Sequence, residues 1–211
     1  MKIVKLTPSK RVKDRYYADL EDGSKLKVNV NLIADHGLFT GRDLDEEELA
    51  ALRGDADRSE LRARALRITG MRAMSRKELT DRLGEKGAEE QAAEETADWL
   101  EKLGVLDDEE YSKMIARHYT AKGYGKGRVR DELYRRGVPR ELWDGAMAEL
   151  EEADNAIDRI VESKLKCVSP DDGAEAYSKA VKKLTAMLLR RGFSWEEVRS
   201  SLERYKMNSE E

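Results

Sequence analysis

Apolar positions along the chain follow two different periods. From about residue 59 onward they recur at spacings of three and four, which gathers side chains on one face of a helix. Before residue 54 they alternate, as in Leu26, Val28 and Val30, a pattern typical of half-buried strands. The sequence therefore predicts a helical region preceded by a segment that contains strands.

The helical region is repetitive. The run Leu-x-x-basic-Gly occurs three times, ending at Gly87, Gly137 and Gly192. Each copy predicts a helix end, because glycine adopts the left-handed backbone of a C′ cap and a cation suits the negative end of the helix dipole. Apolar residues recur eight and four positions before each glycine and one, six, ten and thirteen positions after it. Each glycine is therefore expected to join two amphipathic helices, and a further helix precedes each pair at roughly 59–73, 108–122 and 153–166.

Helix start signals support this division. Ser75 with Glu78 and Ser194 with Glu197 form capping-box patterns, and Asp107 precedes an acidic residue at the same spacing. We expect a mostly α chain of three tandem three-helix repeats in an elongated, curved arrangement, since each unit is too small to stand well alone. The expected repeats are 59–105, 106–152 and 153–207. Separate bundles on short linkers are the alternative.

Residues 1–54 are expected to form a small α+β domain. The alternating segments predict a three-stranded antiparallel sheet with a turn at Asp22-Gly23. A short helix near 31–35 and another that starts at Asp45 and ends at Gly54 would cover its apolar face. A short linker is expected at 54–58.

Composition places the chain in the cytoplasm. Among 211 residues, 40% are charged and 6% aromatic, and no apolar run is long enough to cross a membrane or to form a signal peptide. The single cysteine, Cys167, excludes an internal disulfide and suits a reducing compartment. It is interpreted as an inert small apolar residue rather than a nucleophile.

Charge is segregated, although the net charge is only −4. Residues 62–82 hold seven basic and two acidic side chains, 85–110 hold eleven acidic and two basic, and 113–140 hold nine basic and two acidic. If successive repeats keep a similar orientation, their basic helices form a stripe that attracts a polyanion or an acidic protein groove. Solvated helix faces with weak salt bridges are the alternative.

The predicted partner-binding residues are the cations of the middle repeat, with a secondary basic surface on the other two. The first group is Arg117, Lys122, Lys126, Arg128, Arg130, Arg135 and Arg136, and the second is Arg72, Arg76, Lys77, Arg190 and Arg191. The glycine-rich tract 122–128 is either a place where backbone approaches a partner or a flexible turn between helices.

Groups for catalysis are sparse. His36 and His118 have no second histidine or cysteine at metal-ligand spacing, and no phosphate-binding loop is present. Neighbouring acidic pairs lie on generally acidic helices, where adjacent side chains point about 100° apart. No catalytic residue, metal or cofactor is expected, which leaves a non-enzymatic binding or regulatory protein that acts as a monomer.

The order and spacing of four segments resemble the RecX family, bacterial regulatory proteins that modulate the RecA recombinase. The segments are Ser75-Arg76-Lys77-Glu78-Leu79 followed by Leu83-x-x-Lys86-Gly87; Leu103-Gly104-Val105-Leu106-Asp107-Asp108-Glu109-Glu110-Tyr111; Glu132-Leu133-x-x-Arg136-Gly137-Val138; and Arg190-Arg191-Gly192-Phe193. The resemblance covers about 60–206, and residues 1–54 resemble the extension of some longer members.

The resemblance implies a partner and an activity without chemistry. Its members bind RecA filaments in the helical groove and hinder recombination, ATP hydrolysis and coprotease activity, in DNA repair and the SOS response. The same partner is expected here, with single- or double-stranded DNA as a further candidate. The alternative is a protein that binds DNA directly through helix-turn-helix-like units.

Overall fold

The computed structural model describes residues 1–151, 156–166 and 174–209, and Cys167 lies outside them. The chain is mostly helical with an N-terminal antiparallel sheet, as predicted. It divides into two compact units, which are described separately. Unit 1 comprises Met1–Ala73 and Leu79–Val105, and unit 2 comprises Met74–Glu78 and the chain from Leu106 onward.

The sheet of unit 1 is the predicted meander. Strands β1 (Ile3–Pro8), β2 (Arg15–Leu20) and β3 (Lys25–Asn29) pair antiparallel in the order β1-β2-β3. The turn between β2 and β3 places Gly23 at φ 81°, and the backbone N–H of Ser24 donates to the Asp22 carboxylate at 2.9 Å. The turn signal in the sequence is therefore confirmed.

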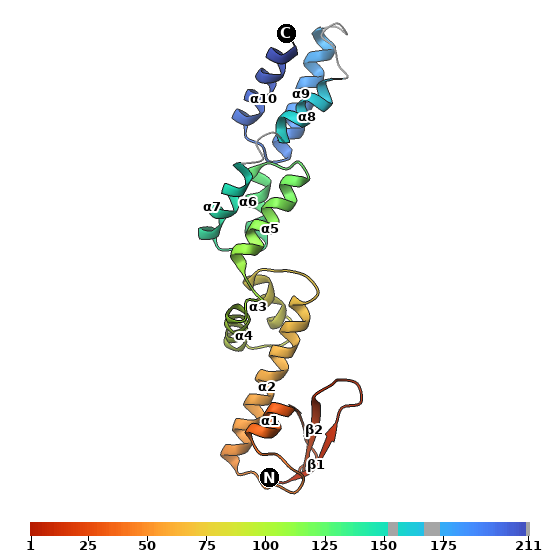
Figure 1. Ribbon diagram of the computed structural model, residues 1–211, viewed down its shortest axis with the longest axis vertical. Coiled ribbons are helices and arrows are strands. Elements are labelled where there is room, and N and C mark those ends of the chain that lie inside the picture. The colour runs from red at the N-terminus through yellow and green to blue at the C-terminus, as the bar shows by residue number, and fades with distance from the viewer. Residues whose placement is uncertain (152–155, 167–173, 210–211) are drawn as a thin grey trace. The chain divides into compact units, whose positions relative to one another are not determined.

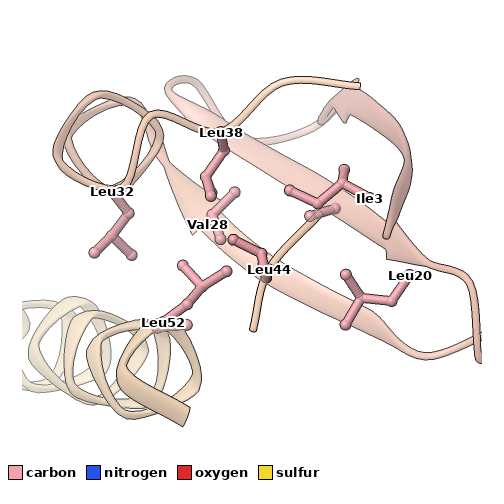
Figure 2. Packing of buried hydrophobic residues seen from close by; sticks show 9 residues of the cluster. Ile3, Leu20, Val28, Leu32, Leu38, Leu44 and Leu52 are labelled. Atoms are coloured by element: carbon pink, nitrogen blue, oxygen red, sulfur yellow. The ribbon is translucent and has the colours of Figure 1, made fainter. Parts of the chain in front are cut away.

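One face of this sheet forms a leucine-rich core with two helices. Ile3, Leu20 and Val28 point from the strands toward Leu32 of α1 (Val30–Asp35) and Leu52 of α2 (Glu46–Thr69), as Figure 2 shows. Each of these side chains is at least nine-tenths buried, so each contributes roughly 1.5–3 kcal/mol relative to exposure. The opposite face of the sheet does not contribute to this core.

Helix α2 corrects one prediction. It runs without a break from Glu46 to Thr69, so a helix end at Gly54, a linker at 54–58 and a separate helix from 59 are wrong. An interior glycine costs about 1 kcal/mol relative to alanine, and burial of Leu52 and Ala56 offsets that cost. The Lys27 ammonium also binds Glu60 at 2.7 Å, which ties the second half of α2 to the sheet. The predicted boundary between the N-terminal domain and the first repeat therefore falls inside a helix.

The remaining helices of unit 1 follow the repeat pattern. Helix α3 (Arg76–Gly84) buries Leu79 and Leu83, and α4 (Glu90–Lys102) buries Ala93, Ala97 and Leu100. The first residues of α3 are counted with unit 2, because their contacts lie there. The Ser75 capping box is present: its hydroxyl accepts from the Glu78 N–H at 3.0 Å, and the Glu78 carboxylate accepts from the Ser75 N–H at 3.3 Å.

Unit 2 contains two further helix triplets with separate cores (Figure 1). The first comprises α5 (Asp108–Ala121), α6 (Lys126–Arg135) and α7 (Trp143–Glu151), with a short 3-10 turn at Arg140–Leu142 before α7. The second comprises α8 (Ala156–Leu165), α9 (Ala174–Arg190) and α10 (Trp195–Ser209). Helices α5 and α8 lie within the ranges predicted for them.

The three glycine joints share one hydrogen-bond geometry. Gly87, Gly137 and Gly192 have φ of 86°, 66° and 87°. In each joint the N–H of the next residue donates back to the leucine carbonyl four positions before glycine, at 3.0, 3.0 and 3.2 Å. This bond closes a Schellman-type helix end, so the recurring motif is confirmed as a structural joint.

Candidate partner-binding surface

Helix α6 carries most of the predicted basic surface of unit 2. Val129, Glu132 and Leu133 are buried on one side of the helix. The other side leaves Arg128 and Arg130 exposed to solvent, and we call it the α6 surface. It comprises the exposed residues Arg128, Arg130, Asp131, Tyr134 and Arg135. A helix only ten residues long thus presents three guanidinium groups against one carboxylate.

Tyr134 was missed by the sequence interpretation. It is 69% exposed and lies one helical turn from Arg130, so a large aromatic ring stands among the cations. Its position three residues before Gly137 is not one of the recurring apolar positions of the repeat. An aromatic residue off the apolar pattern of a basic helix was a signal available in the sequence, because such a ring has no core to enter.

The other predicted residues of the middle repeat lie at or near the ends of its helices. Arg117 of α5 is half-exposed and pairs with Glu110 at 2.5 Å. Lys122 is exposed at the C-terminal end of α5, and Lys126 is half-buried at the first position of α6. Arg117 and Lys126 are therefore less available to a partner than Arg128 and Arg130, whereas Lys122 is exposed.

A buried carboxylate anchors the end of α6. Glu132 is 1% exposed and accepts hydrogen bonds from Arg135 at 2.6 and 2.7 Å and from Arg136 at 2.7 Å. Burial raises the pKa of this carboxyl, but the hydrogen bonds from the two guanidinium groups outweigh it and hold the pKa below the usual range. Glu132 therefore stays ionised and fixes the cations around it.

Arg136 takes part in a longer chain of polar contacts. Its guanidinium also donates to the Tyr111 hydroxyl at 2.5 Å, and that hydroxyl donates to Glu78 at the start of α3 at 2.9 Å. Burial lowers the pKa of Arg136, and hydrogen bonding to Glu132 and to Tyr111 more than compensates, so the pKa is raised. A partner would have to compete with these groups for Arg136, whereas Arg135 keeps 69% of its side chain exposed.

The glycine-rich tract makes its close approach inside the molecule. The N–H of Gly125 donates to the Arg191 carbonyl and that of Gly127 to the Gly192 carbonyl, both at 2.9 Å. A Cβ added at Gly125 would lie 2.5 Å from the Gly192 oxygen, so only glycine permits this contact. The guanidinium of Arg191 also lies 5.9 Å from the ring centroid of Tyr124. The tract therefore holds the third joint and is not a free loop.

The second joint makes the equivalent contact one repeat earlier. The Ser75 hydroxyl donates to the Arg136 carbonyl, as the Gly125 amide does to the Arg191 carbonyl. Ser75 and Gly125 both stand twelve residues before the glycine of their own repeat. In two successive repeats, the glycine joint therefore contacts the N-terminal end of the second helix of the repeat before it.

The secondary basic residues come from three separate segments of the chain. Arg72 belongs to unit 1, where its guanidinium donates to the Ala73 carbonyl at 3.1 Å. The N–H of Arg76 donates to Asp108 at 2.8 Å, and Lys77 packs against Gly137. Arg190 is exposed, whereas Arg191 is half-buried in the joint. The structure thus places Arg128, Arg130 and Arg135 together on α6, with Lys77 and Arg191 beside the second and third glycine joints.

Two further features of the described residues concern metal binding and membrane insertion. No group of three or more histidine, cysteine, aspartate or glutamate side chains is arranged to hold a metal ion in the described part of the chain. No described helix combines the length and the apolar character needed to cross a bilayer.

Fold and surface together define a class, a protein of tandem three-helix units with a small N-terminal sheet. Comparison with known proteins makes the class specific: models of the first and second three-helix domains of RecX match residues 62–100 and 107–147. The "Regulatory protein RecX" of Mycobacterium sp. (strain JLS) is 33% identical over 137 residues, covering 63% of this chain and 74% of that protein. The chain belongs to the RecX family of regulatory proteins.

Two further relatives extend the similarity to the N-terminal sheet. "Regulatory protein RecX" of Clostridium tetani is 23% identical over 203 residues, covering 95% of this chain and 93% of that protein. The crystal structure of a regulatory protein RecX superposes with a TM-score of 0.71 at 21% identity, covering 96% of this chain and 98% of that one. The sheet and the helical repeats therefore belong to one shared fold.

Proposed function

We propose that this chain is a non-enzymatic regulator that binds the RecA filament and modulates its recombinase, ATPase and coprotease activities. It acts as a cytoplasmic monomer in recombinational DNA repair and the SOS response. Membership of a family of regulatory proteins supports the regulatory role. The RecA filament as partner comes from the resemblance described above.

The observation that carries the proposal is the α6 surface. Its cations are exposed, and Arg135 is pre-oriented by a buried carboxylate, so ordering it on binding costs less side-chain entropy. Arginine and tyrosine are the residues enriched at the energetic centres of protein interfaces, and Tyr134 stands exposed among three arginines. Such a surface suits an acidic groove between protomers of a filament.

Sequence-specific reading of duplex DNA is the weaker alternative. The exposed side chains of α6 include no asparagine or glutamine, the residues that most often read adenine in the major groove. Arginine can read guanine, and the exposed Arg128 and Arg130 are the feature of α6 that supports this alternative. Salt-dependent binding to naked duplex with a clear sequence preference would favour this alternative.

The test is DNA-dependent ATP hydrolysis by the cognate RecA, measured with increasing amounts of this chain. The expected result is a change in the hydrolysis rate that saturates. The variant Arg128→Glu/Arg130→Glu/Tyr134→Ala should need at least about 10-fold more protein for the same effect, because hot-spot side chains each contribute about 2 kcal/mol or more.

The matched control reverses two exposed lysines elsewhere in unit 2, Lys164→Glu/Lys166→Glu. It should act as the wild type does, with unchanged helical circular dichroism in both variants. No change of the hydrolysis rate at several-fold excess of the wild-type chain would refute the proposed function. Equal loss in the control variant would remove the α6 surface from the mechanism.

A further inference from the structure

The face of the N-terminal sheet opposite its core carries a different chemistry. Ile3, Ala18, Leu20 and Val28 point into the core, so the residues that alternate with them point outward. Strand register sets these outward residues in rows across the three strands, and both helices that pack on the sheet contact β3. The rows are Lys5–Asp19–Lys25 and Thr7–Tyr17–Lys27, whereas Asn29, the last residue of β3, accepts from the Leu32 N–H of α1 and donates to Ser59 of α2.

This outer face is basic around one aromatic ring. Tyr17 lies on the central strand, between Thr7 of β1 and Lys27 of β3. Lys25 is neutralised by Asp19 at 3.1 Å and Lys27 by Glu60 at 2.7 Å. Lys5 is exposed and, among the described residues, has no carboxylate within ion-pair distance.

The loop between β1 and β2 adds three more cations. Residues 9–14 include Lys10, Arg11 and Lys13, all exposed and likewise without a carboxylate partner in the described part of the chain. The loop is closed at its base, where the Ser9 N–H donates to the Arg15 carbonyl at 2.7 Å. The Ser9 hydroxyl accepts from two loop amides at 3.2 and 3.3 Å. In Figure 1 it stands clear of α1 and α2.

We propose that this outer sheet face, with Tyr17 and the loop 9–14, binds single-stranded DNA. Four unpaired cations attract a chain of phosphates, and a tyrosine ring on a strand offers a platform on which an unpaired base can stack. A duplex cannot use that ring, because its bases already stack on one another. The choice of DNA over RNA rests on the proposed function, which takes place on filaments formed on single-stranded DNA.

The test measures fluorescence anisotropy of a labelled oligothymidylate of about 16 nucleotides, with the full chain and no recombinase present. The logarithm of the affinity should fall with the logarithm of salt concentration with a slope of about −3, the value for four phosphates on a single strand. Tyr17→Ala should weaken binding about 5-fold or more, and Tyr17→Phe should retain it, because phenylalanine keeps the stacking ring.

Charge reversal of the loop provides a second variant that does not touch a strand. Lys10→Glu/Arg11→Glu/Lys13→Glu should abolish measurable binding. The control Lys102→Glu/Lys164→Glu/Lys166→Glu changes the net charge by the same amount at exposed lysines outside the sheet. Its affinity for the oligonucleotide should fall much less than that of the loop variant. Melting temperature and circular dichroism establish that each variant is folded.

Several results would overturn the inference. Unchanged binding by both the Tyr17→Ala and the loop variants would show that the sheet face is not the binding site. Binding of duplex DNA as tightly as the single strand would also contradict the proposed site. A matched oligouridylate bound more tightly than the thymidylate would refute DNA as the ligand. The proposed function fails separately: a chain that binds the oligonucleotide but leaves ATP hydrolysis unchanged refutes the regulator and not this site.

Discussion

The contact between the third joint and α6 predicts unequal effects from one substitution made at two equivalent glycines. Gly87 and Gly192 have nearly equal φ, 86° and 87°, so alanine at either position carries the same left-handed strain of roughly 1–2 kcal/mol. A Cβ at Gly87 meets no atom within 4 Å. A Cβ at Gly192 would overlap the backbone nitrogen of Arg128 and lie 3.0 Å from its Cα.

The size of the destabilisation at Gly192 depends on which atoms the added Cβ would displace. Backbone cannot rotate aside as a side chain can, so the overlap at Gly192 must separate the joint from α6. Overpacking of this kind costs about 1–3 kcal/mol. The hydrogen bonds from Gly125 and Gly127 to the joint lengthen as well, each worth about 0.5–1.5 kcal/mol. Strain, overpacking and the two weakened hydrogen bonds together should make Gly192→Ala destabilise unit 2 by about 3–8 kcal/mol, whereas Gly87→Ala should cost only the strain, about 1–2 kcal/mol.

Urea unfolding followed by circular dichroism compares the free energies of unfolding of the two variants. Hydrogen exchange of the segment 123–128 localises the effect, because Gly125 and Gly127 donate their amides to the joint. Faster exchange there is expected in Gly192→Ala and wild-type exchange in Gly87→Ala. Equal destabilisation by the two substitutions, with equal protection of this segment, would refute the contact.

Three other perturbations test further parts of the account. Glu132→Gln should lower stability at neutral pH by about 1–3 kcal/mol, because the three charged hydrogen bonds from Arg135 and Arg136 weaken. Since the pKa of Glu132 is lowered in the folded chain, its contribution is present above the usual carboxyl range and is lost as pH falls through the lowered value. Acid unfolding monitored by circular dichroism should thus be less steep in the variant, and an unchanged acid profile contradicts this. Gly54→Ala should stabilise the chain by about 0.5–1 kcal/mol in thermal unfolding, since α2 is continuous and only Arg58 lies near the added Cβ, at 3.7 Å. Destabilisation would instead indicate that the helix is interrupted at Gly54. Ser75→Ala should lower the free energy of unfolding by about 1–2 kcal/mol, because it removes both the α3 cap and the hydrogen bond to the Arg136 carbonyl. A decrease below about 0.5 kcal/mol, measured by urea unfolding, would contradict this double role of Ser75.

Local signals carried most of what the sequence could predict. The glycine joints and the Ser75 capping box involve residues within five positions of one another, so backbone preference and side-chain spacing determine them almost alone. The alternating strands and the Asp22-Gly23 turn are local in the same sense. These elements were all predicted from residue type and spacing.

Long-range contacts account for what the sequence interpretation missed. Gly54-Asp55 has the composition of a helix stop, but burial of Leu52 and Ala56 under the sheet overrides that preference. Gly125 meets Gly192, 67 positions further on by residue number, and no local pattern reveals that pairing. The missed residue of the candidate site, Tyr134, was visible as an aromatic off the repeat pattern.

Binding to the RecA filament is the most direct test of the role proposed for the α6 surface. Filaments of the cognate RecA on single-stranded DNA are sedimented with the wild-type chain, with Arg128→Glu/Arg130→Glu/Tyr134→Ala and with the control Lys164→Glu/Lys166→Glu. Wild type and control should sediment with the filament, and the α6 variant should stay in solution. Sedimentation of the α6 variant to the same extent as the wild type, or failure of the wild type to bind, would contradict that role.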